Sequence, residues 1–264
     1  MELFSLKGKS AIVTGSTRGI GKATALRLAE HGANVIVCGR SADTAKKVAE
    51  EINRRVGAER AVGAAFDLAG AFEPLIATAV ERFGRLDVLV CNAAHIAFGV
   101  LDAAEDASIA ESFALNVTKN GRFAAAAAPI MARNGGGSIM FITSINGFYT
   151  NPPLVAYSLA KAALHHLVGF LALQHGPANV RVNAIAPGLV QTDASSAMEQ
   201  DTVGYGRLMA QTPFRRIGKP DEIAGAVVFL ASPAGGYATG QVYVVDGGAM
   251  VSGTQALREI LGGS

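Results

Sequence analysis

The chain has 264 residues, 50% of them hydrophobic, and a formal net charge of +2. This length suits one α/β domain with a large buried core, and the small net charge argues against nucleic acids and membrane surfaces as partners. The two cysteines, Cys38 and Cys91, each end an apolar segment and are expected to be small core side chains in a reducing cytoplasm. No apolar stretch near the N-terminus resembles a signal peptide, and the alanine-rich stretch 124–128 is too short to span a membrane.

Short apolar segments alternate with helical patterns along the chain. Strands are predicted over 11–13, 35–37, 61–66, 88–91, 138–143, 181–185 and 241–245. Helices are predicted over 19–31, 42–56, 72–83, 103–116, 121–132, 157–175 and 221–230. This alternation predicts a doubly wound α/β fold, with one parallel sheet covered by helices on both faces, in a single domain over residues 1–264.

A glycine-rich turn joins the first predicted strand to the first predicted helix. Its sequence is Thr14-Gly15-Ser16-Thr17-Arg18-Gly19-Ile20-Gly21. Glycine permits a tight turn and a close approach of the backbone to a phosphate, and the helix N-terminus offers free N–H groups and a partial positive charge. In this strand-turn-helix context the turn predicts a dinucleotide site; the alternative interpretation is a tight turn without a ligand.

Tyr157 and Lys161 lie one turn apart in the helix predicted over 157–175, so their side chains share one face. An ammonium charge nearby favours the ionised phenol and is expected to lower the pKa of Tyr157 from its reference value of about 10. A phenol tuned in this way can give a proton to a carbonyl or take one from an alcohol. Such pairs also recur by chance on exposed helices, so the interpretation depends on the glycine-rich turn that precedes this pair.

Together the two motifs resemble those of the short-chain dehydrogenase/reductase family, whose fold is Rossmann-like. The family pattern Thr-Gly-x-x-x-Gly-x-Gly matches at all four fixed positions of the glycine-rich turn. The resemblance covers nearly the whole chain and continues through Asn92-Ala93-Ala94, Pro187-Gly188 and Asp246-Gly247-Gly248. Ala94 is a departure, because the family carries glycine at this position.

The resemblance implies a catalytic set of four residues: Asn116, Ser144, Tyr157 and Lys161. The family transfers hydride between a nicotinamide cofactor and a ketone or alcohol. Ser144 is expected to stabilise the developing oxyanion, and Tyr157 to supply the proton. Lys161 is expected to lower the pKa of Tyr157 and to bind the nicotinamide ribose, and Asn116 to hold a water that connects Lys161 to solvent.

The resemblance also implies a cofactor site at the carboxyl ends of the strands. The expected contacts are Gly15, Ser16, Thr17, Arg18, Gly19, Ile20, Gly21, Arg40, Asp67, Leu68, Asn92, Tyr157, Lys161, Pro187, Gly188, Val190 and Thr192. NADP is favoured over NAD, because Gly39 stands where NAD-binding members carry an aspartate, and because Arg18 and Arg40 could clamp a 2′-phosphate. Asp67 is expected to accept a hydrogen bond from the adenine amine; its alternative role is to cap the next helix.

Substrate features are expected near the same strand ends. Residues 191–217 are expected to form the substrate lid, as in the family. Apolar pocket candidates favour an apolar ketone or alcohol without a strong charge; they are Ile96, Phe98, Ile145, Phe148, Tyr149 and Tyr205. No metal site is expected. The family resemblance implies a homotetramer built on the helices 121–132 and 157–175, with His165 directed towards a subunit contact.

Two alternative functions stay open. The segment 179–188 is similar to that of 3-oxoacyl-(acyl carrier protein) reductases, which implies a fatty acyl thioester as substrate. The stretch 175–178, however, offers little positive charge for an acidic carrier protein. The other alternative is a sensor that binds NADP without turnover, and the intact Ser144, Tyr157 and Lys161 argue against it.

Overall fold

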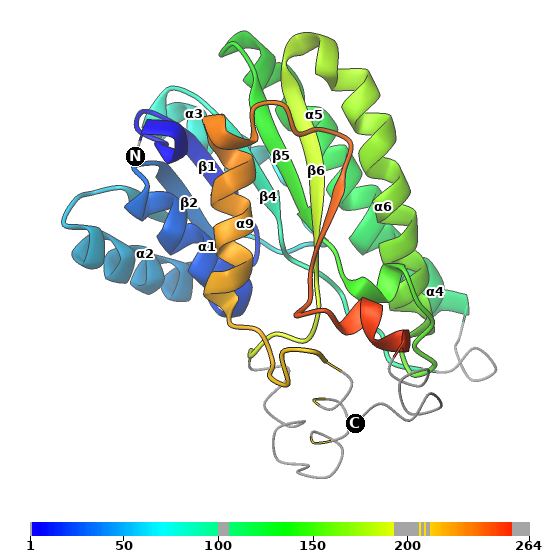
Figure 1. Ribbon diagram of the computed structural model, residues 1–264. Helices are drawn as coiled ribbons and strands as arrows, with labels where there is room; N and C mark the ends of the chain where they lie inside the picture. The colour runs from blue at the N-terminus through cyan, green and yellow to red at the C-terminus, as the bar shows by residue number, and fades with distance from the viewer. Residues whose placement is uncertain (1, 100–105, 193–205, 207–208, 210–211, 255–264) are drawn as a thin grey trace.

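The computed structural model describes residues 2–99, 106–192, 206, 209 and 212–254. Its strands form one parallel sheet in the order β3-β2-β1-β4-β5-β6-β7 (Figure 1). The strands are β1 (Ser10–Val13), β2 (Asn34–Gly39), β3 (Ala61–Ala65), β4 (Val88–Cys91), β5 (Gly137–Ile142), β6 (Val180–Pro187) and β7 (Val242–Val245). The direction of winding reverses between β1 and β4, and such a reversal leaves a crevice at the carboxyl ends of the strands.

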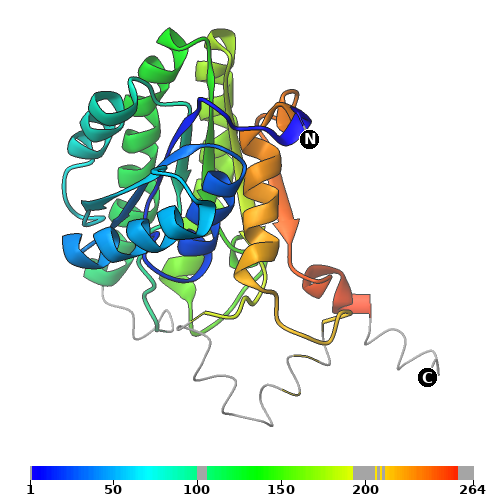
Figure 2. The ribbon, with the colours of Figure 1, turned by 90° about the vertical axis from the view of Figure 1, so that its left-hand side faces the viewer.

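Helices cover both faces of the sheet, as the views in Figures 1 and 2 show. One face carries α1 (Gly19–Glu30), α2 (Ala42–Val56) and α9 (Pro220–Ala231). The other face carries α3 (Glu73–Phe83), α5 (Asn120–Arg133) and α6 (Val155–His175), with α4 (Asp106–Phe113) against α6. The predicted doubly wound α/β fold is therefore confirmed.

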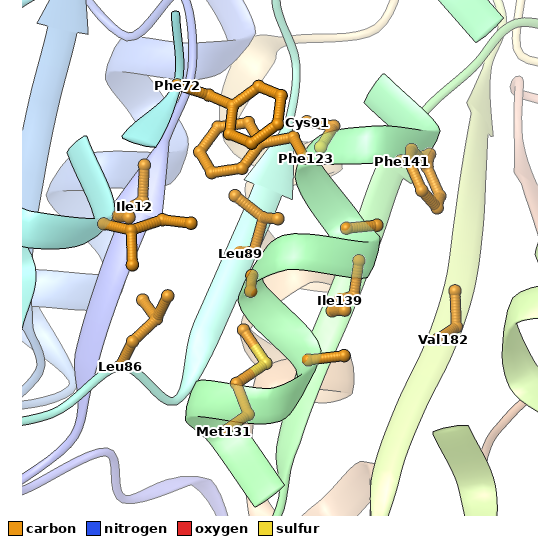
Figure 3. Close-up of a cluster of buried hydrophobic side chains, with 14 of the residues drawn as sticks. Ile12, Phe72, Leu86, Leu89, Cys91, Phe123, Met131, Ile139, Phe141 and Val182 are labelled. Carbon is orange, nitrogen blue, oxygen red and sulfur yellow. The ribbon is translucent and has the colours of Figure 1, made fainter. Parts of the chain in front are cut away.

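The core on the α5 side is built from aromatic and aliphatic side chains (Figure 3). Phe72 stacks on Phe123 of α5, with ring centroids 4.9 Å apart and an interplanar angle of 11°. Leu89 of β4 and Ile139 of β5 lie beneath α5 and are fully buried. Burying one such side chain stabilises the fold by about 1.5–3 kcal/mol, and parallel strands covered on both faces are accordingly apolar along their length. This packing fixes the strand ends on which the site is built.

The helix predicted over 103–116 differs from the observed one. Residues 103–105 lie outside the described part, and α4 continues beyond Phe113 through a π-helical segment, Ala114–Lys119, directly into α5. The amide of Asn120 donates to the carbonyl oxygens of Asn116 at 3.0 Å and Leu115 at 3.4 Å. The Asn120 side chain thus bonds backbone oxygens of the widened turn. Helix propensity does not reveal such a π-helical turn, and turns of this kind are frequent at functional sites.

In the described part of the chain, one helical stretch, Val155–Ala178, is long and apolar enough to cross a membrane by length and composition. It contains α6, which lies along the sheet and contributes Leu164 and Val168 to the core. Helices that cover a core sheet meet the same length and composition criteria.

Candidate active site

The glycine-rich turn is fastened to the end of β4. The hydroxyl oxygen of Thr14 accepts hydrogen bonds from the N–H groups of Asn92 and Ala93, both at 2.9 Å. In return, the Asn92 amide donates to the carbonyl oxygens of Thr14 at 2.9 Å and Gly15 at 3.2 Å. A side chain at Gly21 would collide with the Gly15 carbonyl, and Gly15 has φ +61, a conformation that favours glycine. The turn is therefore a glycine cradle at the N-terminus of α1, where free N–H groups favour an anion.

Ser16 and Thr17 support this turn from below. The buried Ser16 hydroxyl donates to the Val13 carbonyl at 2.6 Å and accepts from the Cys38 N–H at 2.9 Å. Its side chain is thereby used within the fold, so any contact of Ser16 with a cofactor would involve its backbone. Thr17 lies against Gly39, where an added Cβ would be 2.8 Å from the Thr17 methyl carbon. A side chain at position 39 would therefore crowd Thr17.

Arg18 and Arg40 are both exposed, one at the start of α1 and the other just after β2. Asp67 is also exposed and follows β3; its carboxylate accepts from the Ala69 N–H at 2.9 Å. Because α3 begins at Glu73, Asp67 is not its N-cap, and that alternative interpretation is wrong. Leu68, next to Asp67, packs on the core.

Ser144, Tyr157 and Lys161 meet where α6 crosses the end of β5. Lys161 lies with its Nζ 5.3 Å from the centre of the Tyr157 ring and donates to the Ile142 carbonyl at 2.9 Å. The Ser144 hydroxyl lies close enough to the phenol of Tyr157 to lower its pKa. The Ser144 oxygen also accepts from the Asn146 N–H at 3.1 Å, which leaves its own proton to be donated towards the site.

Burial controls the protonation of this group. Tyr157 is 9% exposed and Lys161 2%. Burial raises the pKa of Tyr157 to about 12, although the neighbouring Ser144 hydroxyl acts in the opposite direction. The predicted lowering of the Tyr157 pKa is therefore wrong, because removal from water is the largest influence on this phenol. Burial also lowers the pKa of Lys161 to about 8. At neutral pH the phenol is a protonated acid beside a weakened cation.

Asn116 lies in the π-helical segment and is fully buried. Its amide nitrogen donates to the His95 carbonyl at 2.8 Å and to the Ser112 hydroxyl at 3.1 Å, and its oxygen accepts from the His95 N–H at 3.0 Å. The side chain therefore joins this helix to the loop after β4. The expected role of Asn116 in holding a water stays a prediction.

These elements surround a cavity of about 790 Å³. Of the expected site residues, the cavity is lined by Ile20, Asn92, Ser144, Tyr157, Lys161, Pro187, Gly188, Val190 and Thr192. Its apolar wall includes Ile96, Phe98, Ile145, Tyr149, Leu154, Met209 and Met250. Phe148 is not part of the lining, and the pocket candidate Tyr205 lies outside the described residues, as does most of the lid predicted over 191–217.

The prediction that His165 points towards a subunit contact is wrong, because its ring packs against the chain at the end of β5. Its Nε2 lies 2.9 Å from the Thr143 hydroxyl, and its ring lies 4.3 Å from that of Phe148. Phe148 therefore covers His165 instead of lining the cavity. One turn beyond Lys161, α6 still faces the end of β5, so this position lies inside the fold.

Further lining residues were not predicted from the sequence. Asn146 and Asn151 face the cavity, and Asn146 could have been found from its place two residues after Ser144. Arg216 also lines the cavity and pairs with Glu222 through two contacts, at 2.6 and 2.8 Å. This pair is six residues apart and forms only because the intervening chain turns, so no simple spacing predicts it.

The cysteines Cys38 and Cys91 are free and buried, as predicted, and burial raises the pKa of the Cys38 thiol to about 12. Among the described residues, no three His, Cys, Asp or Glu side chains are grouped so that they could hold a metal ion.

Comparisons with known proteins identify the family of the chain. A family model described as enoyl-(acyl carrier protein) reductase matches residues 15–250. The chain is 37% identical over 243 residues to 7alpha-hydroxysteroid dehydrogenase of Escherichia coli, covering 92% of this chain and 94% of that protein. It is 38% identical over 251 residues to dehydrogenase/reductase SDR family member 4 of Bos taurus, covering 93% and 88%.

A solved structure shares the same fold over almost its full length. It is a 7 alpha-hydroxysteroid dehydrogenase complexed with NADH and 7-oxo glycochenodeoxycholic acid, with a TM-score of 0.86 and 37% identity. The match covers 94% of this chain and 96% of that one. With these relatives, the glycine-rich turn and the paired Tyr157 and Lys161, the chain belongs to the short-chain dehydrogenase/reductase family of oxidoreductases.

Proposed function

We propose that the protein reduces a ketone to a secondary alcohol with NADPH, and catalyses the reverse reaction, with Tyr157 as the acid and base. One observation carries the proposal: Ser144, Tyr157 and Lys161 line the same cavity as two residues at the expected cofactor site. These two are Ile20 of the glycine-rich turn and Asn92, which is hydrogen-bonded to that turn. A carbonyl placed beside Ser144 and Tyr157 would then lie in the space that also reaches the glycine-rich turn.

In this mechanism Ser144 and Tyr157 act on the carbonyl oxygen. Ser144 donates a hydrogen bond to the carbonyl oxygen as negative charge develops there. The Asn146 N–H, which donates to the Ser144 oxygen, keeps the hydroxyl oriented. Tyr157 gives its proton to the same carbonyl oxygen; its raised pKa keeps it protonated until charge appears. Lys161, with a pKa of about 8, can hold or release a proton near neutral pH and restore the phenol. The bound nicotinamide supplies the hydride.

The cofactor would be held along the strand ends. The turn from Gly15 to Gly21 would bind the pyrophosphate, and Asp67 and Leu68 would lie at the adenine. Pro187, Gly188, Val190 and Thr192 would lie beside the nicotinamide; all four line the cavity. Arg18 and Arg40 support NADP, because guanidinium groups form paired hydrogen bonds with phosphate oxygens. The solved relative holds NADH, so NAD is the alternative.

Changing Arg40 to Asp tests the choice of cofactor. The substitution places a negative charge where a 2′-phosphate is proposed to bind, so the kcat/KM ratio of NADPH to NADH should fall by about ten-fold or more. Steady-state kinetics with both cofactors provide the measurement. Arg54→Asp makes the same charge change on the exposed end of α2 and serves as the control. An unchanged ratio in Arg40→Asp would show that Arg40 does not read the phosphate.

The cavity wall supports an apolar substrate. Arg216 in the lining is neutralised by Glu222, and Asp246 accepts from the N–H groups of Gly248 at 2.9 Å and Met250 at 2.8 Å. The charges of these two lining residues are thus already used within the fold. Together with the hydroxysteroid dehydrogenase relatives, this wall favours a bulky cyclic ketone over a sugar or a charged acid.

Consumption of NADPH against a panel of cyclic ketones, acyl thioesters and sugars tests the proposed reaction. Turnover is expected with cyclic ketones. Turnover confined to acyl thioesters would instead support the fatty-acid alternative. Tight NADPH binding without consumption of any substrate would support a non-catalytic sensor and refute the proposal.

A further inference from the structure

The helix α6 presents three side chains, one per turn, to three consecutive residues at the end of β5. Tyr157 faces Ser144 in the cavity lining, and Lys161 donates to the Ile142 carbonyl at 2.9 Å. The third contact joins His165 Nε2 to the Thr143 hydroxyl at 2.9 Å. Residues four apart on a helix share a face, so His165 continues the row that begins with the proposed acid. The proposed mechanism uses the first two contacts and leaves the third without a role.

The direction of the third hydrogen bond follows from its neighbours. The Thr143 hydroxyl lies 3.0 Å from the Ile185 carbonyl, and a carbonyl can only accept, so Thr143 donates its proton to β6. The Thr143 oxygen is then the acceptor for His165, which must carry its proton on Nε2. Burial, together with the charge of Lys161, lowers the pKa of His165 to about 4, so the ring is neutral and has one N–H to donate. A continuous chain of hydrogen bonds thus joins α6, β5 and β6.

The same imidazole also contacts the chain that follows Ser144. The short helix Ile145–Gly147 begins there, and a side chain at Gly147 would collide with the His165 ring. Phe148 closes the other side, with its ring 4.3 Å from that of His165. The imidazole is therefore in contact with the residue before Ser144 and with the turn after it.

From these contacts we infer that His165 is a positioning residue, which holds the β5 end and the following turn so that the Ser144 hydroxyl faces Tyr157. His165 itself does not line the cavity. The inference rests on the proposed function of Ser144, and it assigns the orientation of that hydroxyl to a side chain outside the site. Oxyanion stabilisation and proton transfer depend on the exact placement of the Ser144 hydroxyl. Losing the contacts of His165 should therefore reduce turnover more than it reduces cofactor binding.

Two substitutions separate the hydrogen bond of His165 from its bulk. His165→Leu removes the N–H and should lower kcat by about ten-fold while the KM for NADPH stays within two-fold, about the effect of losing one hydrogen bond. His165→Gln places an amide nitrogen near the position of Nε2 and should recover most of kcat. His31→Leu, at the exposed C-terminal end of α1 and outside the cavity lining, is the matched control and should keep wild-type kcat.

Thr143→Val removes the acceptor of His165 and also the hydrogen bond to the Ile185 carbonyl, so it should lower kcat at least as much as His165→Leu. Adding His165→Leu to Thr143→Val should cause no further loss, because the contact between the two side chains is already gone. The proposal is overturned if His165→Leu or Thr143→Val keeps wild-type kcat, or if His165→Gln is no better than His165→Leu. Thermal melting shows whether each variant folds; should His165→Leu unfold, Thr143→Val gives the deciding value.

A structural readout keeps this proposal separate from the proposed reaction. If the wild-type protein reduces no ketone, the proposed function fails, and crystal structures of wild type and His165→Leu then decide the role of His165. The inference predicts that the Ser144 hydroxyl moves away from Tyr157 in the variant. If the Ser144 hydroxyl keeps its wild-type position beside Tyr157 in the variant, the inference is overturned.

Discussion

Removal from water decides the state of the two central side chains. Tyr157 and Lys161 lie next to each other on α6, and both are almost completely buried. Burial disfavours charge on each of them, so the pKa of the phenol is raised and that of the ammonium is lowered. A buried lysine of this kind lowers the stability of the fold. Its proposed role in returning a proton to Tyr157 gives a reason for keeping it.

The cost of Lys161 predicts how stability depends on pH. Its pKa is about 8 in the folded protein and has the ordinary lysine value of 10.5 in the unfolded chain, so between these pH values the unfolded chain binds more protons. The contribution of Lys161 to the free energy of unfolding therefore rises as the pH increases through this window. Urea unfolding of wild type and Lys161→Met measures it: wild-type stability minus variant stability should increase from pH 8 towards pH 10.

Tyr157 does not confuse this comparison. Its pKa is raised from 10.0 to about 12, so its favourable contribution is complete below pH 10 and is lost only above it. A stability difference that stays flat or falls between pH 8 and pH 10 would contradict the assignment of a buried, weakened cation at Lys161.

Among the elements, the ends of β1 and β4 are joined by side chains as well as by the sheet. Thr14 and Asn92 exchange hydrogen bonds across the two strands, so the glycine-rich turn is held where the winding of the sheet reverses. The cradle is thereby coupled to the core beneath it. Loss of these hydrogen bonds should therefore lower both the stability of the fold and the affinity for the cofactor.

Thr14→Val tests the coupling at the strand ends. The substitution keeps the size of the side chain but leaves the Ala93 N–H without its acceptor, while the Asn92 N–H keeps the Val90 carbonyl at 3.1 Å. One unsatisfied donor costs about 1–3 kcal/mol, so the free energy of unfolding should fall by about that amount. Thr14→Ser keeps the hydroxyl and should lose far less. Equal urea-unfolding midpoints for the two variants would contradict this role of the hydroxyl.

On the scale of the whole molecule, α6 has two different faces. Its inner face carries the proposed catalytic row, while its outer face exposes Leu159, Phe170 and Leu173, the last at 80%. Large apolar side chains grouped on one helix face often mark a contact between proteins. We therefore expect a second copy of the chain to pack against this face, in line with the tetramer that the family resemblance implies.

Light scattering during size-exclusion chromatography tests this expectation. The wild-type chain should elute as an oligomer, and a double variant with Phe170→Glu and Leu173→Glu should shift to a smaller mass, because buried unpaired charges oppose association. Leu3→Glu introduces the same charge at another exposed apolar position and should leave the mass unchanged. A monomeric wild type would refute the expected assembly.

The succession of strands and helices along the chain could be predicted from the sequence, because hydrophobic period is a local property. The proposed catalytic residues came from the resemblance of short motifs to those of the family. The meeting of Ser144 with Tyr157 follows from the end of one strand and the start of one helix. The π-helical segment around Asn116 could not be predicted, because it depends on the amide of Asn120 bonding to the carbonyls of the preceding turn.

The raised pKa of Tyr157 and the inward position of His165 also escaped sequence reasoning. Spacing places Lys161 near the phenol but says nothing of how little water reaches either group. His165 lies at the edge of the buried face of α6, and only the packing of Thr143 and Phe148 around it shows which way it points.

Turnover by Tyr157→Phe is the most direct test of the proposed mechanism. The substitution removes one hydroxyl from a buried ring and leaves the glycine-rich turn and Lys161 in place. NADPH-dependent reduction of a cyclic ketone should fall by at least about a thousand-fold, while NADPH binding, followed by fluorescence titration, stays within a few-fold of wild type. A variant that reduces the ketone at the wild-type rate would contradict the assignment of Tyr157 as the proton donor.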